Sequence, residues 1–251
     1  MANKLGKIYI VGLGPGDRDY FSYRAVQAIK EADVIAGYGM YVDLVKDLVE
    51  DKEVISKGMK KEIERANLAI EEAKKGKNVA VISGGDPGVY GMAGIVLELA
   101  DPEIEIEVVP GITAATAAAA SLGAPLMHDF AFISLSDLLT PYDKIMDRIK
   151  HCSMADMAIV IYNPRSHGRQ KHLDEAREVM LKYKSPETPV GLVRNAKRGE
   201  EEVVITTLKD LPNEKVDMLT VVLIGNSETR IQNGKMITPR GYHNKEEYKD
   251  S

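Results

Sequence analysis

Three glycine-rich segments each follow a short apolar run, and their backbone groups could bind a ligand. They are residues 11–17 (Val-Gly-Leu-Gly-Pro-Gly-Asp), 83–88 (Ser-Gly-Gly-Asp-Pro-Gly) and 110–113 (Pro-Gly-Ile-Thr). In an open α/β sheet, ligands bind outside the carboxyl ends of the strands. Glycine also lets the backbone approach a ligand closely. Three such turns in the first half of the chain therefore predict a ligand site there.

The first glycine segment fits neither common nucleotide-binding motif. A dinucleotide fingerprint needs a third glycine or alanine, where this chain has Asp17, and an acidic residue about 20 positions further on, where residues 34–38 offer none. A phosphate loop needs Gly-Lys followed by Ser or Thr, which is absent, and Pro15 removes a backbone N–H group. The sequence disfavours a nucleotide-dependent oxidoreductase, and a purely structural turn stays open as an alternative.

Strands and helices alternate around these segments, which indicates an α/β fold. Apolar runs predict strands at 8–10, 79–82, 106–109, 130–135, 157–162, 189–193, 202–206 and 219–224. Helical spacing predicts helices at 20–32, 59–75, 91–100, 113–121, 142–151 and 173–183. We place a boundary near residues 124–130, which gives α/β domains at 1–125 and 126–243 and a polar tail at 244–251.

The composition suits a globular protein of the cytoplasm. The 251 residues are 44% hydrophobic, and a net charge of −5 with a pI near 5.7 argues against a nucleic-acid partner. No apolar stretch is long enough to span a membrane, and the N-terminus lacks the apolar core of a signal peptide. Cys152 is the single cysteine, so no intrachain disulfide can form.

The glycine segments and several later stretches resemble the tetrapyrrole (corrin/porphyrin) methylase family. Residues 12–17, 83–93 and 110–115 match patterns of the whole family. Residues 128–141, 162–166 and 238–242 resemble its subgroup that methylates C17 of precorrin-3B or cobalt-precorrin-3B. The resemblance extends from about residue 7 to residue 242, with small departures at Gly84 and Tyr142.

The resemblance implies two α/β domains with S-adenosylmethionine in the interdomain cleft, and a homodimer. Glycine turns suit this zwitterionic cofactor because backbone groups can reach it without side-chain interference. The positions that match the family's cofactor site are Leu13, Pro15, Gly84, Gly85, Asp86, Val89, Met92, Thr113, Ala114, Tyr162, Asn163, Arg194, Asn195, Ala196, Thr220 and Val222.

The implied reaction is methylation of C17, coupled to contraction of the macrocycle. Methyl transfer from a sulfonium depends mainly on alignment, whereas contraction needs proton transfers. The acid–base candidates lie in the subgroup block and are His128, Asp129, Ser136 and Asp137. For His128 and Asp129, a structural role in the turn after Pro125 is the alternative.

A tetrapyrrole substrate carries many carboxylates, so cationic side chains should gather near it. Arginine pairs with carboxylates in a bidentate manner. The candidates are Arg165, Arg169, Lys171, Arg194, Lys197, Arg198 and Arg240, with ordinary surface charge as the alternative for each.

The sequence predicts no metal site in the protein. His167 and His172 are five residues apart, which does not suit a pair of ligands on one helix, and Cys152 has no partner cysteine. Any cobalt would arrive within the substrate. A methyltransferase acting at another ring carbon and a non-catalytic tetrapyrrole carrier both stay open, as does the choice between a cobalt-containing and a metal-free substrate.

Overall fold

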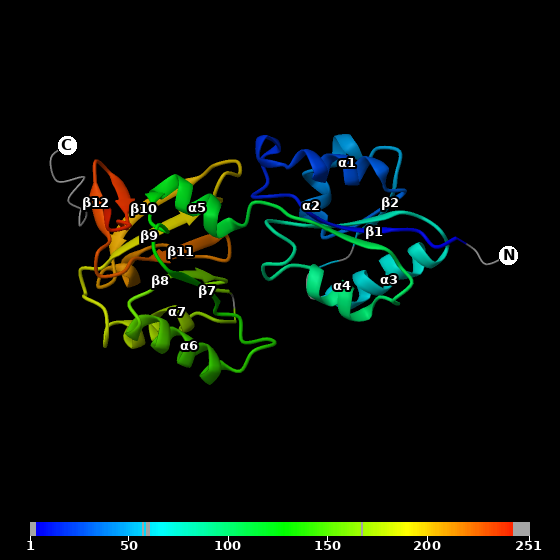
Figure 1. Ribbon diagram of the computed structural model, residues 1–251. Coiled ribbons are helices and arrows are strands. Elements are labelled where there is room, and N and C mark those ends of the chain that lie inside the picture. Colours follow the sequence, from blue (N-terminus) through cyan, green and yellow to red (C-terminus); the bar gives the residue numbers. More distant parts are fainter. Residues whose placement is uncertain (1–3, 57, 59–60, 167, 243–251) are drawn as a thin grey trace. The chain divides into compact units, whose positions relative to one another are not determined.

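The computed structural model describes residues 4–56, 58, 61–166 and 168–242, and the chain forms two compact units. Unit 1 extends to Ala114 and unit 2 begins at Ala115. Each unit is a sheet with helices on both faces, so the predicted α/β class is confirmed (Figure 1). The predicted tail at 244–251 and His167 lie outside the described residues.

Unit 1 contains a five-stranded parallel sheet with the strand order β3-β2-β4-β1-β5. Helices α1 and α2 lie on one face of the sheet, and α3 and α4 lie on the other (Figure 1). The strands are β1 (Ile8–Gly12), β2 (Val34–Gly37), β3 (Glu53–Ser56), β4 (Val79–Ser83) and β5 (Ile106–Val109). The helices are α1 (Tyr23–Glu31), α2 (Gly39–Asp43), α3 (Glu62–Lys74) and α4 (Ala93–Leu99), with 3-10 turns η1 (Arg18–Tyr20) and η2 (Lys46–Leu48).

Alternate side chains of β1 enter two different cores, because successive residues of a strand point to opposite faces. Ile8 and Ile10 pack in the core formed with α3 and α4, whereas Tyr9 and Val11 pack in the core formed with α1. Burial on both faces explains why this strand reads as an unbroken apolar run.

The chain leaves the neighbouring strands β1 and β4 in opposite directions along the sheet. After β1 it passes through α1 to β2, and after β4 it passes through α4 to β5, on the far side of β1. Such a point, where the direction of winding reverses, opens a crevice at the carboxyl ends of the two strands. Two of the predicted glycine loops follow these two strands, and they pair with each other there.

Unit 2 contains a mixed sheet with the order β10-β9-β11-β8-β7, in which only β7 and β8 pair in parallel. Helix α5 lies on one face, while α6 and α7 cover the other (Figure 1). The strands are β7 (Phe130–Ser134), β8 (Ala158–Tyr162), β9 (Pro189–Arg194), β10 (Glu202–Thr207) and β11 (Thr220–Ile224). The helices are α5 (Ala114–Leu122), α6 (Tyr142–Met154) and α7 (His172–Met180), with a 3-10 turn η3 (Leu211–Asn213).

A second, small sheet joins the two ends of unit 2. It consists of β12 (Arg230–Gln232), β13 (Lys235–Ile237) and β6 (Gly123–Ala124), in the order β12-β13-β6. Strand β6 follows α5 directly, so this pairing fixes the beginning of unit 2 to its C-terminal hairpin.

The division between the units lies earlier in the chain than the boundary predicted after residue 125. The alanine-rich helix α5 packs with the second sheet, because Gly191 on β9 leaves the space that the Leu122 side chain fills. The Ser121 hydroxyl also donates a hydrogen bond of 2.7 Å to Glu201. The alanine side chains of α5 form no pattern in the sequence that would assign this helix to the second unit.

The first predicted helix is shorter than expected. The Ser22 hydroxyl accepts the Ala25 N–H at 3.1 Å, so α1 begins at Tyr23 rather than at residue 20. Asp17, which disrupts the nucleotide fingerprint, accepts the Asp19 N–H and caps the short turn η1.

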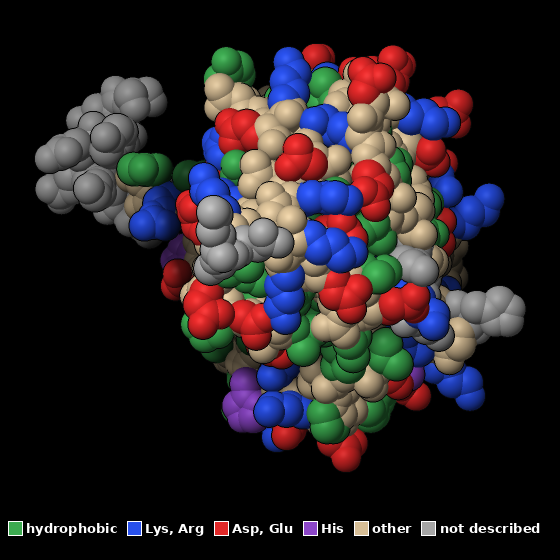
Figure 2. Space-filling view, turned by 90° about the vertical axis from the view of Figure 1, so that its right-hand side faces the viewer, with side chains coloured by type: hydrophobic (Ala, Val, Ile, Leu, Met, Phe, Trp, Pro, Cys, Tyr) green, Lys and Arg blue, Asp and Glu red, His purple; other side chains and the backbone are tan. Residues whose placement is uncertain are grey.

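Acidic and basic side chains are interspersed on the face shown in Figure 2, with no large area of one sign. Within the described part of the chain, none of the helices combines the length and the apolar character needed to cross a bilayer.

Candidate functional site

The glycine loops after β1 and β4 are joined to each other by backbone hydrogen bonds. The Gly14 N–H donates to the Gly85 carbonyl at 3.1 Å, and the Gly85 N–H donates to the Gly14 carbonyl at 2.7 Å. Both residues have positive φ, +66° and +69°, which glycine adopts at little cost. The predicted convergence of these loops at the sheet's carboxyl edge is confirmed.

The third glycine segment packs against the other two. A Cβ atom on Gly111 would lie 2.2 Å from the Gly85 carbonyl oxygen, and one on Gly12 would lie 2.7 Å from both the Gly111 nitrogen and that same oxygen. Close backbone approach therefore requires glycine at both positions, independently of any ligand. The segments form one rigid unit at the crevice.

Asp86 connects the second loop to the third. Its Oδ1 atom accepts the Gly88 N–H at 2.8 Å, and its Oδ2 atom accepts the Gly111 N–H at 3.0 Å. The carboxylate of this predicted cofactor residue is thus used to hold the loops in place.

The predicted cofactor residues of unit 1 differ in what they can present to a ligand. The Leu13 side chain is fully buried in the core, and Met92 and Thr113 are also buried. These three residues could therefore contact a ligand only through backbone groups that reach the surface. Several others are partly exposed on the loops, namely Pro15, Gly84, Gly85, Asp86, Val89 and Ala114.

Most predicted cofactor residues of unit 2 share one edge of its sheet, which we call the Tyr162 edge and define by Ser134, Tyr162, Arg194 and Thr220. Ser134 pairs with Tyr162 at the end of β7 and β8, and Arg194 pairs with Thr220. Asn163, Asn195 and Ala196 follow directly after β8 and β9. Val222 is different, because its side chain is fully buried within the sheet.

Polar side chains at the Tyr162 edge hold the local backbone. The Tyr162 hydroxyl accepts the Ala115 N–H at 2.9 Å, which satisfies a free donor at the start of α5. Asn163 and Asn195 both have φ of +52°, a conformation that asparagine tolerates better than most residues. The Asn163 amide donates to Ser134 Oγ at 3.0 Å.

Several predicted substrate-binding cations pair with carboxylates of the protein itself. Arg165 donates to Asp174 at 2.8 Å, and Arg194 Nε donates to Asp217 at 2.9 Å. Lys197 Nζ lies 3.6 Å from Glu201. The partner carboxylates Asp174 and Asp217 are about half exposed, so a substrate carboxylate could replace them. Lys171 and Arg198 are exposed or half-buried at this end of the unit.

Asp137 and Ser136 follow β7 at the Tyr162 edge, and Asp137 contacts two side chains. His172 Nε2 lies 3.1 Å from Asp137 Oδ2, and Arg169 Nε lies 3.6 Å from Oδ1. Arg169 also donates to the Leu135 carbonyl at 2.9 Å. His172 was considered in the sequence only as a metal ligand, and no spacing rule connects it to a loop 35 residues away.

His128 and Asp129 do not lie with Ser136 and Asp137, which corrects the expectation that the four residues act together. One pair precedes the five-residue strand β7, and the other follows it. At about 3.3 Å per residue, this strand separates the pairs by roughly 16 Å. Nearness in the sequence is misleading here because an extended strand carries its two ends to opposite edges of the sheet.

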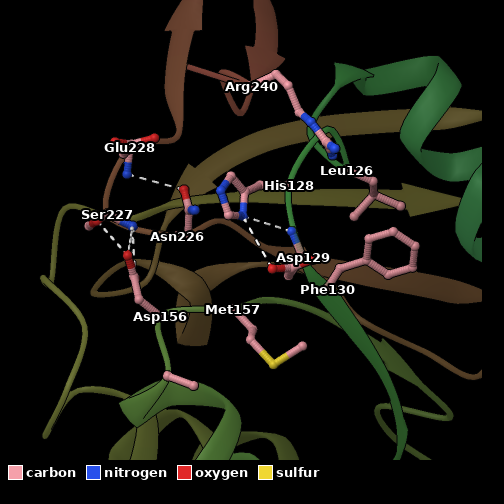
Figure 3. Close-up of a pocket in the computed structure, with 11 residues that line it drawn as sticks. Leu126, His128, Asp129, Phe130, Asp156, Met157, Asn226, Ser227, Glu228 and Arg240 are labelled. Atoms are coloured by element: carbon pink, nitrogen blue, oxygen red, sulfur yellow. Dashed lines mark hydrogen bonds and ion pairs between the residues drawn. The ribbon is translucent and has the colours of Figure 1, made fainter. Parts of the chain in front are cut away.

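His128 and Asp129 instead line a pocket of about 690 Å³ at the opposite edge of unit 2 (Figure 3). The Asp129 N–H donates to His128 Nδ1 at 2.9 Å, and the Arg240 guanidinium, a predicted substrate contact, donates to the Met127 carbonyl at 3.2 Å. No motif or spacing pointed to the other lining residues, which are Leu126, Phe130, Ala155, Asp156, Met157, Asn226, Ser227 and Glu228.

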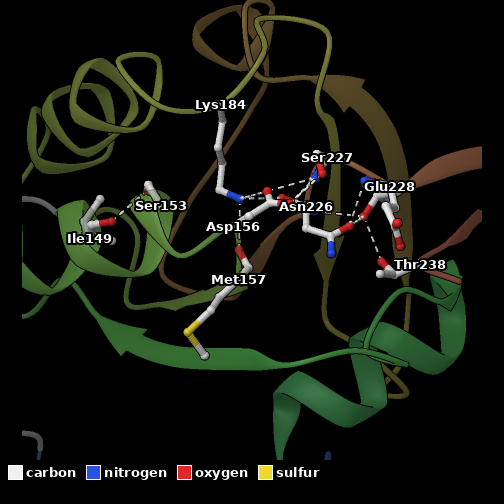
Figure 4. Close-up of polar contacts among 11 residues, drawn as sticks. Ile149, Ser153, Asp156, Met157, Lys184, Asn226, Ser227, Glu228 and Thr238 are labelled. Atoms are coloured by element: carbon white, nitrogen blue, oxygen red, sulfur yellow. Dashed lines mark hydrogen bonds and ion pairs between the residues drawn. The ribbon is translucent and has the colours of Figure 1, made fainter. Parts of the chain in front are cut away.

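A buried lysine fixes one wall of this pocket (Figure 4). Lys184 Nζ donates to the carbonyls of Met157 and Gly225 at 2.9 and 3.1 Å, and lies 3.6 Å from Asp156. Burial lowers the pKa of Lys184, and the Asp156 carboxylate opposes this shift. The Ser227 N–H donates to the same carboxylate at 3.0 Å, so the wall is a connected structural network.

Within the described residues, no group of three or more His, Cys, Asp or Glu side chains is arranged to hold a metal ion. Cys152 is half-buried, and this burial raises the pKa of its thiol. The thiolate form is therefore disfavoured.

Residues 7–212 match the model of the family described as Tetrapyrrole (Corrin/Porphyrin) Methylases. The chain is 50% identical over 236 residues to the "Probable cobalt-factor III C(17)-methyltransferase" of Salmonella typhimurium, covering 93% of this chain and 98% of that protein. It is 48% identical over 247 residues to the "Cobalt-factor III methyltransferase" of Priestia megaterium. That alignment covers 96% of this chain but only 46% of the longer relative.

Solved structures give a consistent result. The methyltransferase CobJ superimposes with a TM-score of 0.87 at 37% identity, covering 93% of this chain and 100% of that one. A uroporphyrin-III C-methyltransferase from Thermus thermophilus, complexed with S-adenyl homocysteine, gives a TM-score of 0.70 at 26% identity, with 88% and 92% covered.

Proposed function

The chain belongs to the tetrapyrrole (corrin/porphyrin) methylases, and on this premise we propose that it transfers a methyl group from S-adenosylmethionine to C17 of cobalt-factor III in cobalamin biosynthesis. The observation that carries the proposal is the 50% identity to the Salmonella relative, which the chain matches over nearly the whole of both proteins. The sequence alone did not distinguish a cobalt-containing substrate from a metal-free one. The names of the two relatives favour the cobalt-containing form.

The glycine-loop crevice of unit 1 is the proposed cofactor site. Its wall is a rigid backbone surface, because Gly14 and Gly85 bond to each other and Asp86 holds Gly111. A preformed surface of this kind orients a ligand with little further loss of the protein's own conformational entropy. This suits methyl transfer, where alignment of donor and acceptor supplies much of the catalysis.

The cations at the Tyr162 edge are the proposed contacts for substrate carboxylates. Arg165, Arg169 and Arg194 already hold carboxyl or carbonyl oxygens in the structure. A substrate carboxylate that replaces such a partner meets a guanidinium whose position is fixed in advance. We also expect a homodimer in the cytoplasm, and light scattering on the purified protein measures its mass.

Anaerobic incubation with cobalt-factor III and ¹³C-methyl S-adenosylmethionine tests the reaction. We expect a gain of one methyl group by mass analysis and a single new methyl resonance that is assigned to C17. Label at another carbon would show that the enzyme methylates a different position of the macrocycle. Stoichiometric cofactor binding without methylated product would favour the non-catalytic carrier. Metal-free factor III is the matched comparison, and faster turnover of the metal-free form would refute the cobalt preference.

A further inference from the structure

Asp137 and His172 form a carboxylate–imidazole pair at the Tyr162 edge. The Asp137 side chain exposes 38% of its surface, whereas His172 exposes only 17%. Asp137 is therefore the member that a ligand can reach. Its Oδ2 atom lies 3.1 Å from His172 Nε2, and Arg169 lies beside the other oxygen.

The groups around His172 hold the ring in one orientation. The Tyr142 ring, on α6, meets the imidazole edge-on with 5.1 Å between centroids. The Tyr142 hydroxyl in turn donates to Glu175 of α7 at 2.7 Å. Among the described residues, the titratable groups that contact the imidazole are Asp137 and Tyr142, and these in turn contact Arg169 and Glu175. Of the two carboxylates, Asp137 bonds to the imidazole and Glu175 bonds to the tyrosine.

Asp137 remains ionised in this setting. Partial burial acts to raise the pKa of Asp137, but the hydrogen bond from His172, a hydrogen bond to its own backbone N–H and, least of all, the charge of Arg169 together bring the pKa below its ordinary value. An ionised carboxylate with a fixed orientation and an exposed face can accept a proton.

The proposed reaction requires such an acceptor. When the S–CH₃ bond breaks, both bonding electrons stay on sulfur, and an electron pair of the macrocycle forms the new C–C bond. The positive charge of the sulfonium thereby moves to the macrocycle, and release of one proton from the macrocycle cancels it.

We propose that His172 is a positioning residue that holds the Asp137 carboxylate in one orientation, so that Asp137 accepts this proton. The inference rests on the proposed methyl transfer, and it adds to it a residue pair that the sequence did not connect. His172 need not touch the substrate itself.

Two substitutions of His172 distinguish the effect of its hydrogen bond to Asp137 from the effect of the imidazole ring itself. His172→Leu removes the bond, whereas the amide nitrogen of His172→Gln can still donate to Asp137. We expect His172→Leu to lower kcat, but by less than the roughly 10²–10⁴-fold that an acid–base group itself contributes. The acid limb of its kcat/KM profile should move to higher pH because Asp137 loses the bond that lowers its pKa. His172→Gln should recover most of kcat.

His151→Leu is the matched control, because this histidine is exposed on α6 and its ring bonds to the Asp147 backbone carbonyl rather than to a carboxylate. It should leave the profile unchanged. Affinity for S-adenosylhomocysteine should stay the same in all variants, which shows that they fold. The inference is overturned if His172→Leu keeps the wild-type acid limb and kcat.

A measurement without turnover keeps the two proposals separate. The Asp137 carboxyl resonance should titrate at higher pH in His172→Leu than in the wild type when followed by NMR. Equal titration refutes the role of His172 whatever the reaction is. Absence of methylated product from the wild type, with the expected titration difference, refutes only the proposed function.

Discussion

Gly14 and Gly85 exchange both of their backbone hydrogen bonds across the crevice at the carboxyl edge of the first sheet. Neither loop can move alone, because each N–H donates to the other's carbonyl and both residues have left-handed φ values. The cofactor surface proposed for unit 1 is therefore fixed before any ligand arrives.

Gly85→Ala should weaken cofactor binding through backbone strain rather than through a clash. The nearest atoms to a Cβ at this position are 3.7 Å away, so the space exists, but φ is +69°. An L-residue in this conformation costs about 1–2 kcal/mol. We expect a comparable loss of unfolding free energy, and roughly tenfold weaker S-adenosylhomocysteine binding by calorimetry where the loop relaxes.

Gly94→Ala is its control, since this glycine lies in α4 with no atom within 4 Å of a Cβ. This substitution should stabilise the protein by about 0.5–1 kcal/mol and leave the affinity unchanged. Unaltered affinity in a folded Gly85→Ala protein would place the cofactor elsewhere.

Asp86→Asn should loosen the link between the second and third glycine loops. The amide keeps one acceptor oxygen and presents an NH₂ group to the other backbone N–H, so one of the two bonds is lost. We expect unfolding free energy to fall by about 1–3 kcal/mol, together with weaker cofactor binding. Asp33→Ala, which removes a similar bond to the Asn78 N–H at the opposite edge, should lower stability without changing affinity. Equal affinity in both variants would contradict a role for the loop link.

Glu107 should make the stability of the protein depend on pH in the acid range. Hydrogen bonds from Arg24 and then Lys7 lower the pKa of Glu107 from 4.5 to about 2. A lowered folded-state pKa contributes stability above the unfolded value, and that contribution is lost as pH falls through the folded value. Urea unfolding should therefore show a decline between about pH 4.5 and 2.

In Glu107→Gln this decline should be shallower. Glu105→Gln, at a side chain that is 74% exposed and pairs with Lys7, should retain most of the wild-type slope. An identical slope in Glu107→Gln and the wild type would show that the network does not control acid stability.

Lys184→Met should destabilise unit 2 although the methionine side chain is of similar length. The substitution leaves the Met157 and Gly225 carbonyls and the Asp156 carboxylate without the ammonium that they share. Unsatisfied buried groups of this kind cost about 1–3 kcal/mol each. Lys182→Met, at an exposed position, should change stability by less than about 0.5 kcal/mol. Thermal unfolding of the two variants makes the comparison, and equal midpoints would show the buried network to be dispensable.

Asp129→Asn and Asp137→Asn should not behave alike, because the two residues lie at opposite ends of β7. Asp137→Asn should reduce methylation by about 10²–10⁴-fold. Asp129→Asn should have the smaller effect. Initial rates of methylated product measure both, and similar losses would mean that the pocket around His128 takes part in the reaction.

The sequence was sufficient to predict most strands of the two larger sheets and the glycine turns that follow them, because buried strands and tight turns leave a local signal. The largely exposed strand β3 and the short helix α2 were not predicted. The hairpin between β12 and β13 was missed although Asn233 and Gly234, with φ of +51° and +71°, form a typical two-residue turn. Its strands have three residues each and are largely exposed, so no apolar pattern accompanied the turn.

The functional site was predictable only where it consists of backbone. Loops after parallel strands must meet at one edge, so Gly14 and Gly85 could be brought together from sequence. The contact between Asp137 and His172 depends on how a loop after β7 folds against α7, and no periodicity records that. His128 was grouped with Asp137 because the two are close in the sequence, although the strand predicted at 130–135 lies between them and separates them in space.

The place of β11 in the second sheet limits how the chain can be divided into fragments. The family match ends at residue 212, yet Thr220–Ile224 forms the middle strand of the sheet, between β9 and β8. A fragment cut at the end of that match would expose two strand edges and lose Met236 and Thr238, which are fully buried. Expression vectors for unit 2, and any fusion partner placed behind it, therefore have to preserve the chain through the terminal hairpin.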